Sequence, residues 1–476
     1  MASARRTWLL LGALTALGAA LRLPFLGLQS LWYDETFTAA VVEQPTLGAL
    51  WDQVRLTEST PPLYYVITWA WAKLAGSTGD AALRAPAAVA GVFCVPAAYL
   101  ALRRLAEERA ALAAATMTAV SPVLVAYSLN ARAYPLLVLL ACLSVWAMAE
   151  LLERRGTRWL AAWALLAAAL LWTHYYAAFL VGAELGVLLW RLAGARARVL
   201  AAGAAVAVAA APLLPLLADQ RDERASNIES LGLGERVEQA VRQLAAGANP
   251  PSRPVEWLAI LLCAAGLAAG AWRAARDRSA RVMAALAAAT ALTPLLLDLT
   301  GIDDHFFMRN LLVAWAPLAG LAALGLTRAR AIPLAAVLLA FAALTIATHA
   351  DWRHHNADWE GALAELGPRT DGVPVVVLPG FDSPVANRYL GRAGASRPLL
   401  ARSVWVVVAP ARKGRAELAE LPGYPRAAPP GFRPTVTRTH HGFRMILLEA
   451  GAEAPLDPAA FGPDQLEGRA VLLAPR

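Results

Sequence analysis

Residues 158–191 read RWLAAWALLAAALLWTHYYAAFLVGAELGVLLWR, an apolar stretch with an arginine at each end. A helix needs roughly 20 apolar residues to cross the hydrocarbon core of a bilayer, and basic residues collect on its cytoplasmic side. Further arginines flank the stretch on both sides, at Arg154, Arg155, Arg196 and Arg198. Both ends therefore belong on the same side, and the stretch is predicted to form two antiparallel helices that turn at Thr173-His174-Tyr175-Tyr176.

The composition of the whole chain agrees with a membrane protein. Of its 476 residues, 58% are hydrophobic and only 16% are charged, which excludes an ordinary soluble globular protein. The net charge of +8 comes from short arginine clusters between apolar runs, so it indicates topology and provides no basic, aromatic-rich surface for nucleic acid. Cys94, Cys142 and Cys263 lie inside apolar runs without CxxC spacing, so neither a disulfide framework nor a zinc site is predicted.

About eleven segments are predicted to span the membrane: residues 7–24, 83–102, 110–129, 133–152, 159–172, 175–190, 199–217, 255–272, 282–300, 311–327 and 332–349. Arg5 and Arg6 place the N-terminus in the cytoplasm, and an odd number of spans places everything after His349 outside. We expect the first span to stay uncleaved, because the apolar character resumes at residues 23–28.

The spans divide the chain into two predicted domains. Residues 1–350 form a membrane domain with large outer loops at about 25–82 and 218–254, and residues 351–476 form an extracytoplasmic domain. Apolar runs of strand length in this tail predict an α/β fold; they lie at 373–378, 404–409 and 445–448, with a helical pattern at 359–366.

Polar and aromatic residues collect at the outer ends of the predicted spans. They lie in five segments, at residues 29–36, 59–65, 127–134, 173–176 and 303–309. Ionisable groups are costly inside a bilayer, so a carboxylate pair directly after a span, Asp34 with Glu35, indicates a functional site. Tryptophan and tyrosine are also common at membrane interfaces, so any one of these aromatic residues alone is weak evidence.

These segments carry a resemblance to a known superfamily. The matching residues are Leu31-Trp32-Tyr33-Asp34-Glu35, Pro61-Pro62-Leu63-Tyr64-Tyr65, Ser121-Pro122, Tyr127-Ser128, Ala131-Arg132-Ala133-Tyr134, Thr173-His174-Tyr175-Tyr176, His305-Phe306-Phe307-Met308-Arg309 and Asp358-Trp359. The chain resembles polytopic glycosyltransferases of the GT-C fold, the superfamily of protein O-mannosyltransferases and lipid A aminoarabinose transferases, and most of all their bacterial members. The acidic pair is the most specific of these motifs.

The resemblance implies an inverting glycosyltransferase of the bacterial cytoplasmic membrane. It would transfer a sugar from a polyprenyl-phosphate carrier to a protein, lipid or cell-wall glycan acceptor at the outer face. Asp34 matches the family's base, which takes the acceptor proton, and Glu35 would orient the acceptor or share the charge. Arg132 matches the arginine that binds the departing phosphate. Further substrate- or phosphate-binding candidates are Tyr64, Tyr65, Tyr134, His174, Tyr175, His305 and Arg309.

One departure from the family pattern bears on whether the site uses a metal ion. Relatives often carry an acid two positions before the arginine, where this chain has Asn130, an amide that offers a carbonyl oxygen but no charge. We therefore expect a metal-independent site, with Asn130, Asp303 and Asp304 as weak candidates for binding a divalent metal. His349, His354, His355 and the pair His440-His441 match no zinc motif by their spacing.

Three other readings remain open. A flippase or other transporter would place ionisable residues near the membrane midplane, where only Glu184 lies, and that residue is interpreted as a hydrogen-bonded packing group. A non-catalytic scaffold, whose outer domain binds a cell-wall partner, stays open because of Asn130. A polymerase or ligase that uses the same lipid donors is not distinguished from a simple transferase.

Overall fold

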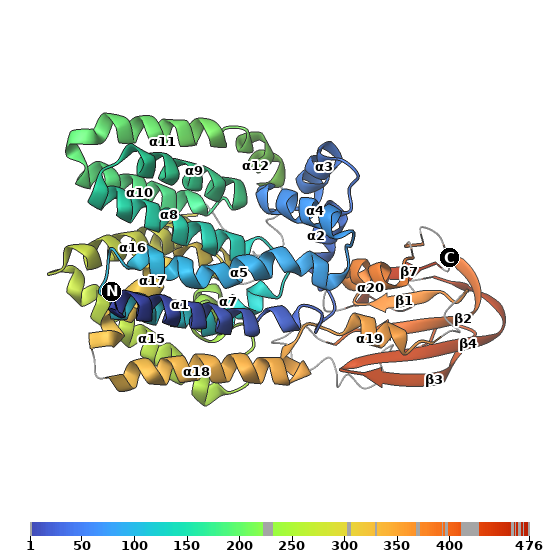
Figure 1. The fold of residues 1–476 in the computed structure, drawn as a ribbon. Coiled ribbons are helices and arrows are strands. Elements are labelled where there is room, and N and C mark those ends of the chain that lie inside the picture. The colour runs from blue at the N-terminus through green and yellow to red at the C-terminus, as the bar shows by residue number, and fades with distance from the viewer. Residues whose placement is uncertain are drawn as a thin grey trace. The chain divides into compact units, whose positions relative to one another are not determined.

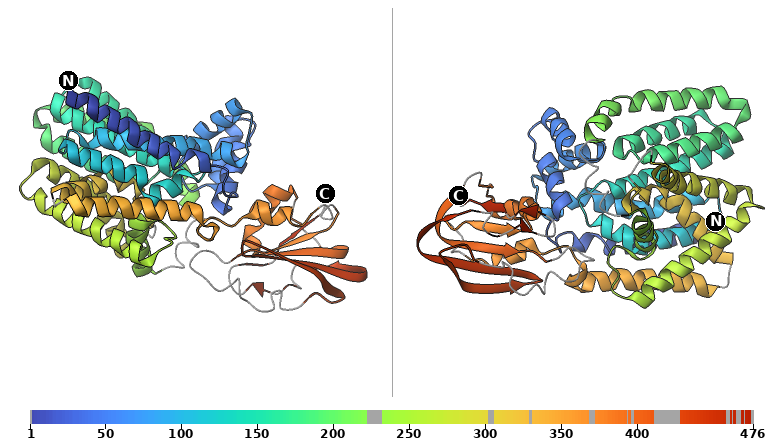
Figure 2. Two further views of the ribbon diagram at one scale, coloured as in Figure 1. Left: turned by 60° about the horizontal axis from the view of Figure 1, so that its bottom comes forward. Right: turned by 180° about the vertical axis from the view of Figure 1, so that it is seen from behind.

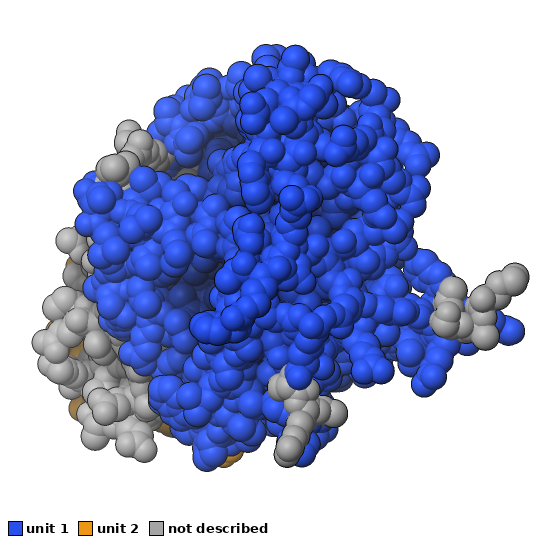
Figure 3. Space-filling model, turned by 90° about the vertical axis from the view of Figure 1, so that its left-hand side faces the viewer, with its two compact units in different colours: residues 1–26, 37–350 blue, residues 27–36, 351–476 orange. Residues whose placement is uncertain are grey.

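The computed structural model describes residues 2–221, 232–301, 306–328, 331–367, 372–392, 394–395, 398–410 and 428–457, together with 461, 463–464, 468–469 and 471–474. The chain forms two compact units, coloured separately in Figure 3. Unit 1 comprises residues 1–26 and 37–350, and unit 2 comprises residues 27–36 and 351–476.

Unit 1 is a bundle of helices (Figure 1). Its helices are α1 (Ala2–Ala20), α3 (Leu47–Thr57), α4 (Leu63–Ala75), α5 (Asp80–Leu102), α6 (Glu108–Val120), α7 (Pro122–Ser128), α8 (Tyr134–Arg154), α9 (Thr157–Thr173), α10 (Ala177–Arg191), α11 (Arg196–Ala210), α12 (Leu213–Arg221), α14 (Leu233–Ala246), α15 (Arg253–Ala274), α16 (Arg278–Leu299), α17 (Trp315–Arg328) and α18 (Ala331–Ala350), with the 3₁₀ segment η3 (Met308–Ala314). Helix α2 (Tyr33–Val42) begins in the segment assigned to unit 2.

Every predicted span is helical, but fewer helices have full spanning length. Among the described residues, eight helices are long and apolar enough to cross a membrane, or nine if the bent pair α6 and α7 is one span. The difference from eleven lies in α9 and α10, which have 17 and 15 residues. At 1.5 Å per residue these are shorter than the roughly 30 Å hydrocarbon core. The predicted turn between them is confirmed, because α9 ends at Thr173 and α10 begins at Ala177.

A buried arginine stabilises the break between α6 and α7. Pro122 starts α7, and the two helices are bent by 51° at this point. The break leaves backbone carbonyls at the end of α6 without helical partners. Arg22, fully buried, donates to the carbonyls of Thr118 and Ala119 at 3.2 and 3.0 Å and to Ser128 Oγ at 3.1 Å. Arg22 therefore holds α7, which leads directly into the loop that carries Arg132.

Two short helices, α3 and α4, lie between α2 and α5. Helix α3 starts at the cap Thr46, whose side chain accepts from the Ala49 N–H, and α4 ends at Gly76 with a φ of 64°. Their apolar faces share a small core formed by Val41, Leu50, Val54, Tyr64, Tyr65, Ala87 and Ala133. Ala133 lies between α7 and α8, so this core packs α3 and α4 against the Arg132 loop.

Two ion pairs anchor α14, which lies between α12 and α15. Arg236 and Asp298 form a buried bidentate pair, with Nη1–Oδ2 at 3.0 Å and Nη2–Oδ1 at 3.3 Å. Arg242 Nε donates to Glu256 Oε1 at 2.6 Å. Asp298 also accepts from the Phe306 N–H at 3.2 Å, so the first pair fixes the chain just before η3.

Unit 2 contains a five-stranded sheet with the order β3-β4-β2-β1-β7, whose strands are labelled in Figure 1. Figure 2 shows the sheet from two further sides. The strands are β1 (Val375–Leu378), β2 (Leu399–Val408), β3 (Phe432–His440), β4 (Phe443–Leu456) and β7 (Val471–Leu473); β5 (Pro463–Asp464) and β6 (Gly468–Arg469) pair separately. β1 and β2 are parallel, and the other neighbours in the sheet are antiparallel.

Alternate residues of the strands supply two cores. Val375 and Val377 pack with residues of α19 (Trp359–Ala364) and α20 (Ser383–Leu390), whereas Val376 and Leu378 face the other core. The α/β fold predicted for the tail is confirmed. β3 was not predicted, because arginines and threonines make it polar and largely exposed.

Candidate functional site

Arg132 lies buried in the loop between α7 and α8. Its Nη1 is 2.9 Å from Glu58 Oε2 and donates to Thr38 Oγ1 at 3.2 Å. Glu58 caps the C-terminus of α3, and Thr38 is on α2. Arg132 and Glu58 are each only 5% exposed, so the pair is almost completely withdrawn from solvent. Sequence reasoning identified Arg132 but missed Glu58, whose only signal was its position just before the Pro61-Pro62-Leu63-Tyr64-Tyr65 motif.

The phenol of Tyr65 is the second donor to Glu58. Its hydroxyl donates to Glu58 Oε2 at 2.5 Å and lies 2.8 Å from Thr60 Oγ1. Burial raises the pKa of Tyr65 well above its ordinary value, an effect that the nearby Arg132 reduces and Glu58 increases. The phenol is therefore protonated at neutral pH and acts as a hydrogen-bond donor. Tyr64, the other tyrosine of the motif, packs edge-on against Tyr65 with 5.6 Å between ring centroids.

Aromatic rings connect the Arg132 loop with the α9–α10 turn. Tyr134 contacts Tyr127 edge-on at 4.9 Å and His174 at 6.0 Å between ring centroids. His174 is buried, and its Nδ1 accepts from the Tyr176 N–H at 3.2 Å. The neutral imidazole therefore carries its proton on Nε2, which makes that nitrogen a donor. Two of the predicted site residues, Tyr134 and His174, thus lie close together.

Tyr175 points to a different neighbour. Its hydroxyl donates to Gln220 Oε1 at 2.9 Å, and Gln220 Nε2 donates to the Val54 carbonyl on α3 at 3.2 Å. Gln220 is buried and belongs to α12. This chain of hydrogen bonds ties the α9–α10 turn to α12 and α3.

Asp34 and Glu35 lie in the first turn of α2 and have different environments. Glu35 is fully buried, and its Oε2 accepts from the N–H of Trp32, the residue before the helix, at 3.2 Å. This is the reciprocal half of a capping box, in which the third helical residue satisfies a backbone donor at the helix start. Asp34 is half-buried, at a position where the helix dipole favours a negative charge.

The remaining predicted residues do not form a metal cluster among the described side chains. Asn130 Nδ2 donates to the Ala126 carbonyl at 3.0 Å, so its amide closes the end of α7. Arg309, in η3, lies over the ring of Phe307 at 5.2 Å. His305 and the weak metal candidates Asp303 and Asp304 lie outside the described residues.

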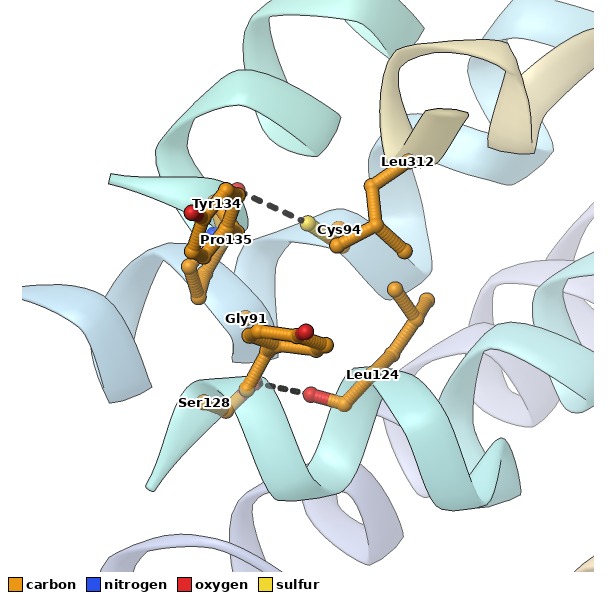
Figure 4. A pocket seen from close by; sticks show the side chains of 8 residues that line it. Gly91, Cys94, Leu124, Ser128, Tyr134, Pro135 and Leu312 are labelled. Carbon is orange, nitrogen blue, oxygen red and sulfur yellow. Dashed lines mark hydrogen bonds between the residues drawn. The ribbon is translucent and has the colours of Figure 1, made fainter. Parts of the chain in front are cut away.

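A small cavity borders the Arg132 loop. Its volume is about 10 Å³, and it is lined by Gly91 and Cys94 of α5, by Leu124, Tyr127 and Ser128 of α7, and by Tyr134, Pro135 and Leu312. Figure 4 shows Ser128 bonded to the Leu124 carbonyl and the Cys94 thiol directed at the Pro135 carbonyl. Such a cavity holds about one water molecule, so it is a packing feature and too small for a sugar.

Glu184 has the packing role that the sequence predicts. It is fully buried in α10, where its Oε2 accepts from Ser144 Oγ at 2.5 Å and from Trp163 Nε1 at 2.8 Å. The carboxyl group thereby links α8, α9 and α10.

The fold defines the class of protein. The described residues form many apolar helices and, in the C-terminal part, a sheet domain. This architecture is that of a polytopic membrane protein of the GT-C fold, which agrees with the resemblance in the sequence. Residues 59–218 match the family model of the dolichyl-phosphate-mannose-protein mannosyltransferases. This match includes Tyr64, Tyr65, Arg132 and His174. A sequence comparison with curated proteins gives no match.

Solved structures have the same fold at low identity. ArnT from Cupriavidus metallidurans in the apo state is 12% identical, with a TM-score of 0.54, and the alignment covers 94% of this chain and 98% of ArnT. ArnT bound to undecaprenyl phosphate gives 0.52 at 12% identity, with 92% and 97% covered. The oligosaccharyltransferase of Archaeoglobus fulgidus, tethered with an acceptor peptide, is 13% identical with a TM-score of 0.49. This chain covers 57% of that longer protein, and 76% of this chain is aligned. At 12% identity, the two ArnT matches show a shared fold.

Proposed function

We propose that this protein transfers a sugar from a polyprenyl-phosphate carrier to an acceptor hydroxyl or amine at the outer face of the cytoplasmic membrane. The observation that carries the proposal is the buried guanidinium of Arg132, held by Glu58 and Thr38 at the end of an outer loop. A buried arginine is an unusual core residue, but it suits a phosphate that departs as an anion, because it delivers charge and paired donors in a fixed geometry. ArnT, the fold relative, was crystallised with undecaprenyl phosphate.

Asp34 is the proposed base of the transfer. In the step, the acceptor atom forms a bond to the anomeric carbon while the bond from that carbon to the phosphate oxygen breaks, with inversion. The acceptor proton passes to the Asp34 carboxylate, and the bond electrons leave with the phosphate. Asp34 precedes Thr38 by four residues, so helical periodicity places both on one face of α2.

Glu35 is proposed as a positioning residue for Asp34. Its hydrogen bond to the Trp32 N–H fixes the first turn of α2, where Asp34 lies. His174, Tyr134, Tyr64 and Arg309 are proposed to line the donor or acceptor path. A metal ion is not required by this reaction, since the leaving group needs charge stabilisation that arginine supplies.

The transfer step is tested with purified protein in proteoliposomes. The donors are ¹⁴C-labelled polyprenyl-phosphate hexoses and pentoses, and the acceptor is a total membrane extract. We expect Asp34→Asn to lower transfer at least 100-fold, which corresponds to about 2.7 kcal/mol at 1.36 kcal/mol per tenfold. Undiminished transfer by a folded Asp34→Asn variant would refute its role as base.

The phosphate site is tested separately by binding. Undecaprenyl phosphate is titrated into the detergent-solubilised protein, and tryptophan fluorescence is recorded. We expect Arg132→Gln to weaken binding at least tenfold, whereas Arg55→Gln, which removes a half-exposed arginine, serves as the matched control and leaves binding unchanged. Equal binding by wild type and Arg132→Gln would exclude Arg132 as the phosphate ligand.

The transporter alternative has one distinguishing outcome. A flippase would move a fluorescent polyprenyl-phosphate sugar between leaflets without breaking its phosphate bond. Leaflet exchange in the proteoliposomes without release of polyprenyl phosphate would favour that reading over transfer.

A further inference from the structure

The turn between β3 and β4 places two histidines beside an acid from a distant part of the chain. His440 ends β3, and His441 with Gly442 forms the two-residue turn before β4. His440 Nε2 lies 2.7 Å from Asp358 Oδ2, and His441 Nδ1 lies 3.2 Å from the same oxygen. The three ligand atoms all lie within 4.8 Å of one another. All three residues belong to unit 2.

Neighbouring groups hold the Asp358 carboxylate in a fixed orientation. Its Oδ1 accepts from the Gly361 N–H at 3.0 Å and from Ser30 Oγ at 3.2 Å, which leaves Oδ2 facing the imidazoles. Burial raises the pKa of Asp358, but the hydrogen bonds from His440, the Gly361 N–H and Ser30 outweigh this effect and lower the pKa overall. The second carboxylate oxygen therefore faces the two imidazole nitrogens, and carboxylate oxygen with imidazole nitrogen is a donor set that zinc takes.

The ring of His441 is also held in place. Trp352 stacks on it, with 4.6 Å between ring centroids and 16° between planes. His441 has a φ of 41°, in the left-handed region that this kind of turn normally fills with glycine or asparagine. Strained backbone of this type collects at functional sites. At Gly361 a Cβ atom would lie 2.4 Å from Asp358 Oδ2 and 2.5 Å from His440 Nε2, so only glycine leaves room for these two atoms.

The spacing of the three groups suits a zinc ion. Zinc binds imidazole nitrogen and carboxylate oxygen at about 2.0–2.1 Å in a tetrahedron, which places neighbouring ligand atoms about 3.3 Å apart. To reach this separation, the distances of 2.7 and 3.2 Å from Asp358 Oδ2 to the two imidazole nitrogens need to lengthen by about 0.6 and 0.1 Å. Calcium and magnesium prefer oxygen ligands, so two imidazoles select against them.

We propose that Asp358, His440 and His441 bind one zinc ion, with the fourth position open to water. The ion joins the start of α19, where Asp358 lies, to the β3–β4 turn, which carries both histidines. The hydrogen bond between Ser30 and Asp358 connects the segment 27–36 to the same site. The spacing of His440 and His441 did not predict this site, because its third ligand lies 82 residues earlier in the chain. The proposal is independent of the proposed function, since none of its ligands takes part in the transfer.

Zinc binding is measured on the full chain in detergent, after removal of metals with EDTA. The protein is dialysed against micromolar free zinc, and bound metal is counted by mass spectrometry. We expect His440→Ala and His441→Ala each to bind one zinc fewer per chain than wild type. The double variant His354→Ala/His355→Ala, which removes two nearby histidines outside the cluster, is the matched control and retains the wild-type count.

A second measurement guards against misfolding of the variants. His441 is exposed, so His441→Ala should unfold at the same temperature as the metal-free wild type. We expect zinc to raise the unfolding temperature of the wild type and of the control, but not that of His441→Ala. Equal zinc counts in wild type, His440→Ala and His441→Ala, or an equal thermal shift in all of them, would overturn the proposal.

Discussion

Breaking the buried pair of Arg132 and Glu58 tests whether these residues act as one unit. The perturbation is a double-mutant cycle of Glu58→Gln and Arg132→Gln. The pair is separated by 2.9 Å with side chains 6% and 1% exposed, so neither charge has access to bulk water. Removing one partner of such a pair leaves an uncompensated buried charge, which costs about 3–5 kcal/mol. Glutamine at position 58 can still accept a hydrogen bond from Tyr65, so we expect the loss of stability in Glu58→Gln to lie near the lower end of this range, at about 3 kcal/mol.

The sign of the coupling is the decisive result. Removing both charges leaves two neutral amides, so we expect the double variant to be more stable than either single variant, with a coupling of about 2–3 kcal/mol. The assay is equilibrium unfolding in SDS and detergent mixed micelles, followed by tryptophan fluorescence. The salt bridge of Arg55 and Asp219 provides the matched cycle, because at 2.6 Å it is equally close but its side chains are 55% and 40% exposed.

We expect the Arg55–Asp219 cycle to give less than about 1 kcal/mol of coupling, as exposed pairs do. Additive losses in the Arg132–Glu58 cycle, or the same small coupling in both cycles, would show that the buried pair is not a unit. The reasoning about a preorganised phosphate site would then fail as well.

Three further predictions concern neighbouring residues. Glu35→Gln keeps an acceptor for the Trp32 N–H, so we expect its transfer activity to stay within about threefold of wild type. Glu35→Ala removes the cap, and we expect it to lose about 0.5–2 kcal/mol of stability in the same unfolding assay. A loss of transfer in Glu35→Gln as large as that in Asp34→Asn would assign Glu35 a chemical role. Arg22→Leu leaves three carbonyls, those of Gly18, Thr118 and Ala119, without the donor that Arg22 supplies, and it should cost about 3 kcal/mol in SDS unfolding. A loss below about 1 kcal/mol would mean that other groups satisfy these carbonyls. Tyr65→Phe removes a hydrogen bond to a carboxylate and should cost about 1.5–3 kcal/mol, with unchanged stability as the contradicting result.

The sequence by itself determined the class of the fold. Apolar length and flanking arginines are local properties, so they located the eight described helices that are long and apolar enough to cross a membrane, and the turn at Thr173–Tyr176. Strand-length apolar runs predicted β1, β2 and β4 for the same reason. The predicted segments 159–172 and 175–190 were already shorter than a full span, and α9 and α10 account for the smaller number of full-length spans in the described structure.

Tertiary structure decided which polar residues meet. Glu58 and Arg132 are 74 residues apart, and His440 and Asp358 are 82 apart, so no local pattern links them. The same holds for Arg22, whose partners lie 96 to 106 residues later at the end of α6 and on α7. The local pattern of apolar and charged residues determines which segments favour lipid and which favour water. The pairing of buried charges depends on which helices pack together, and that is a property of the whole chain.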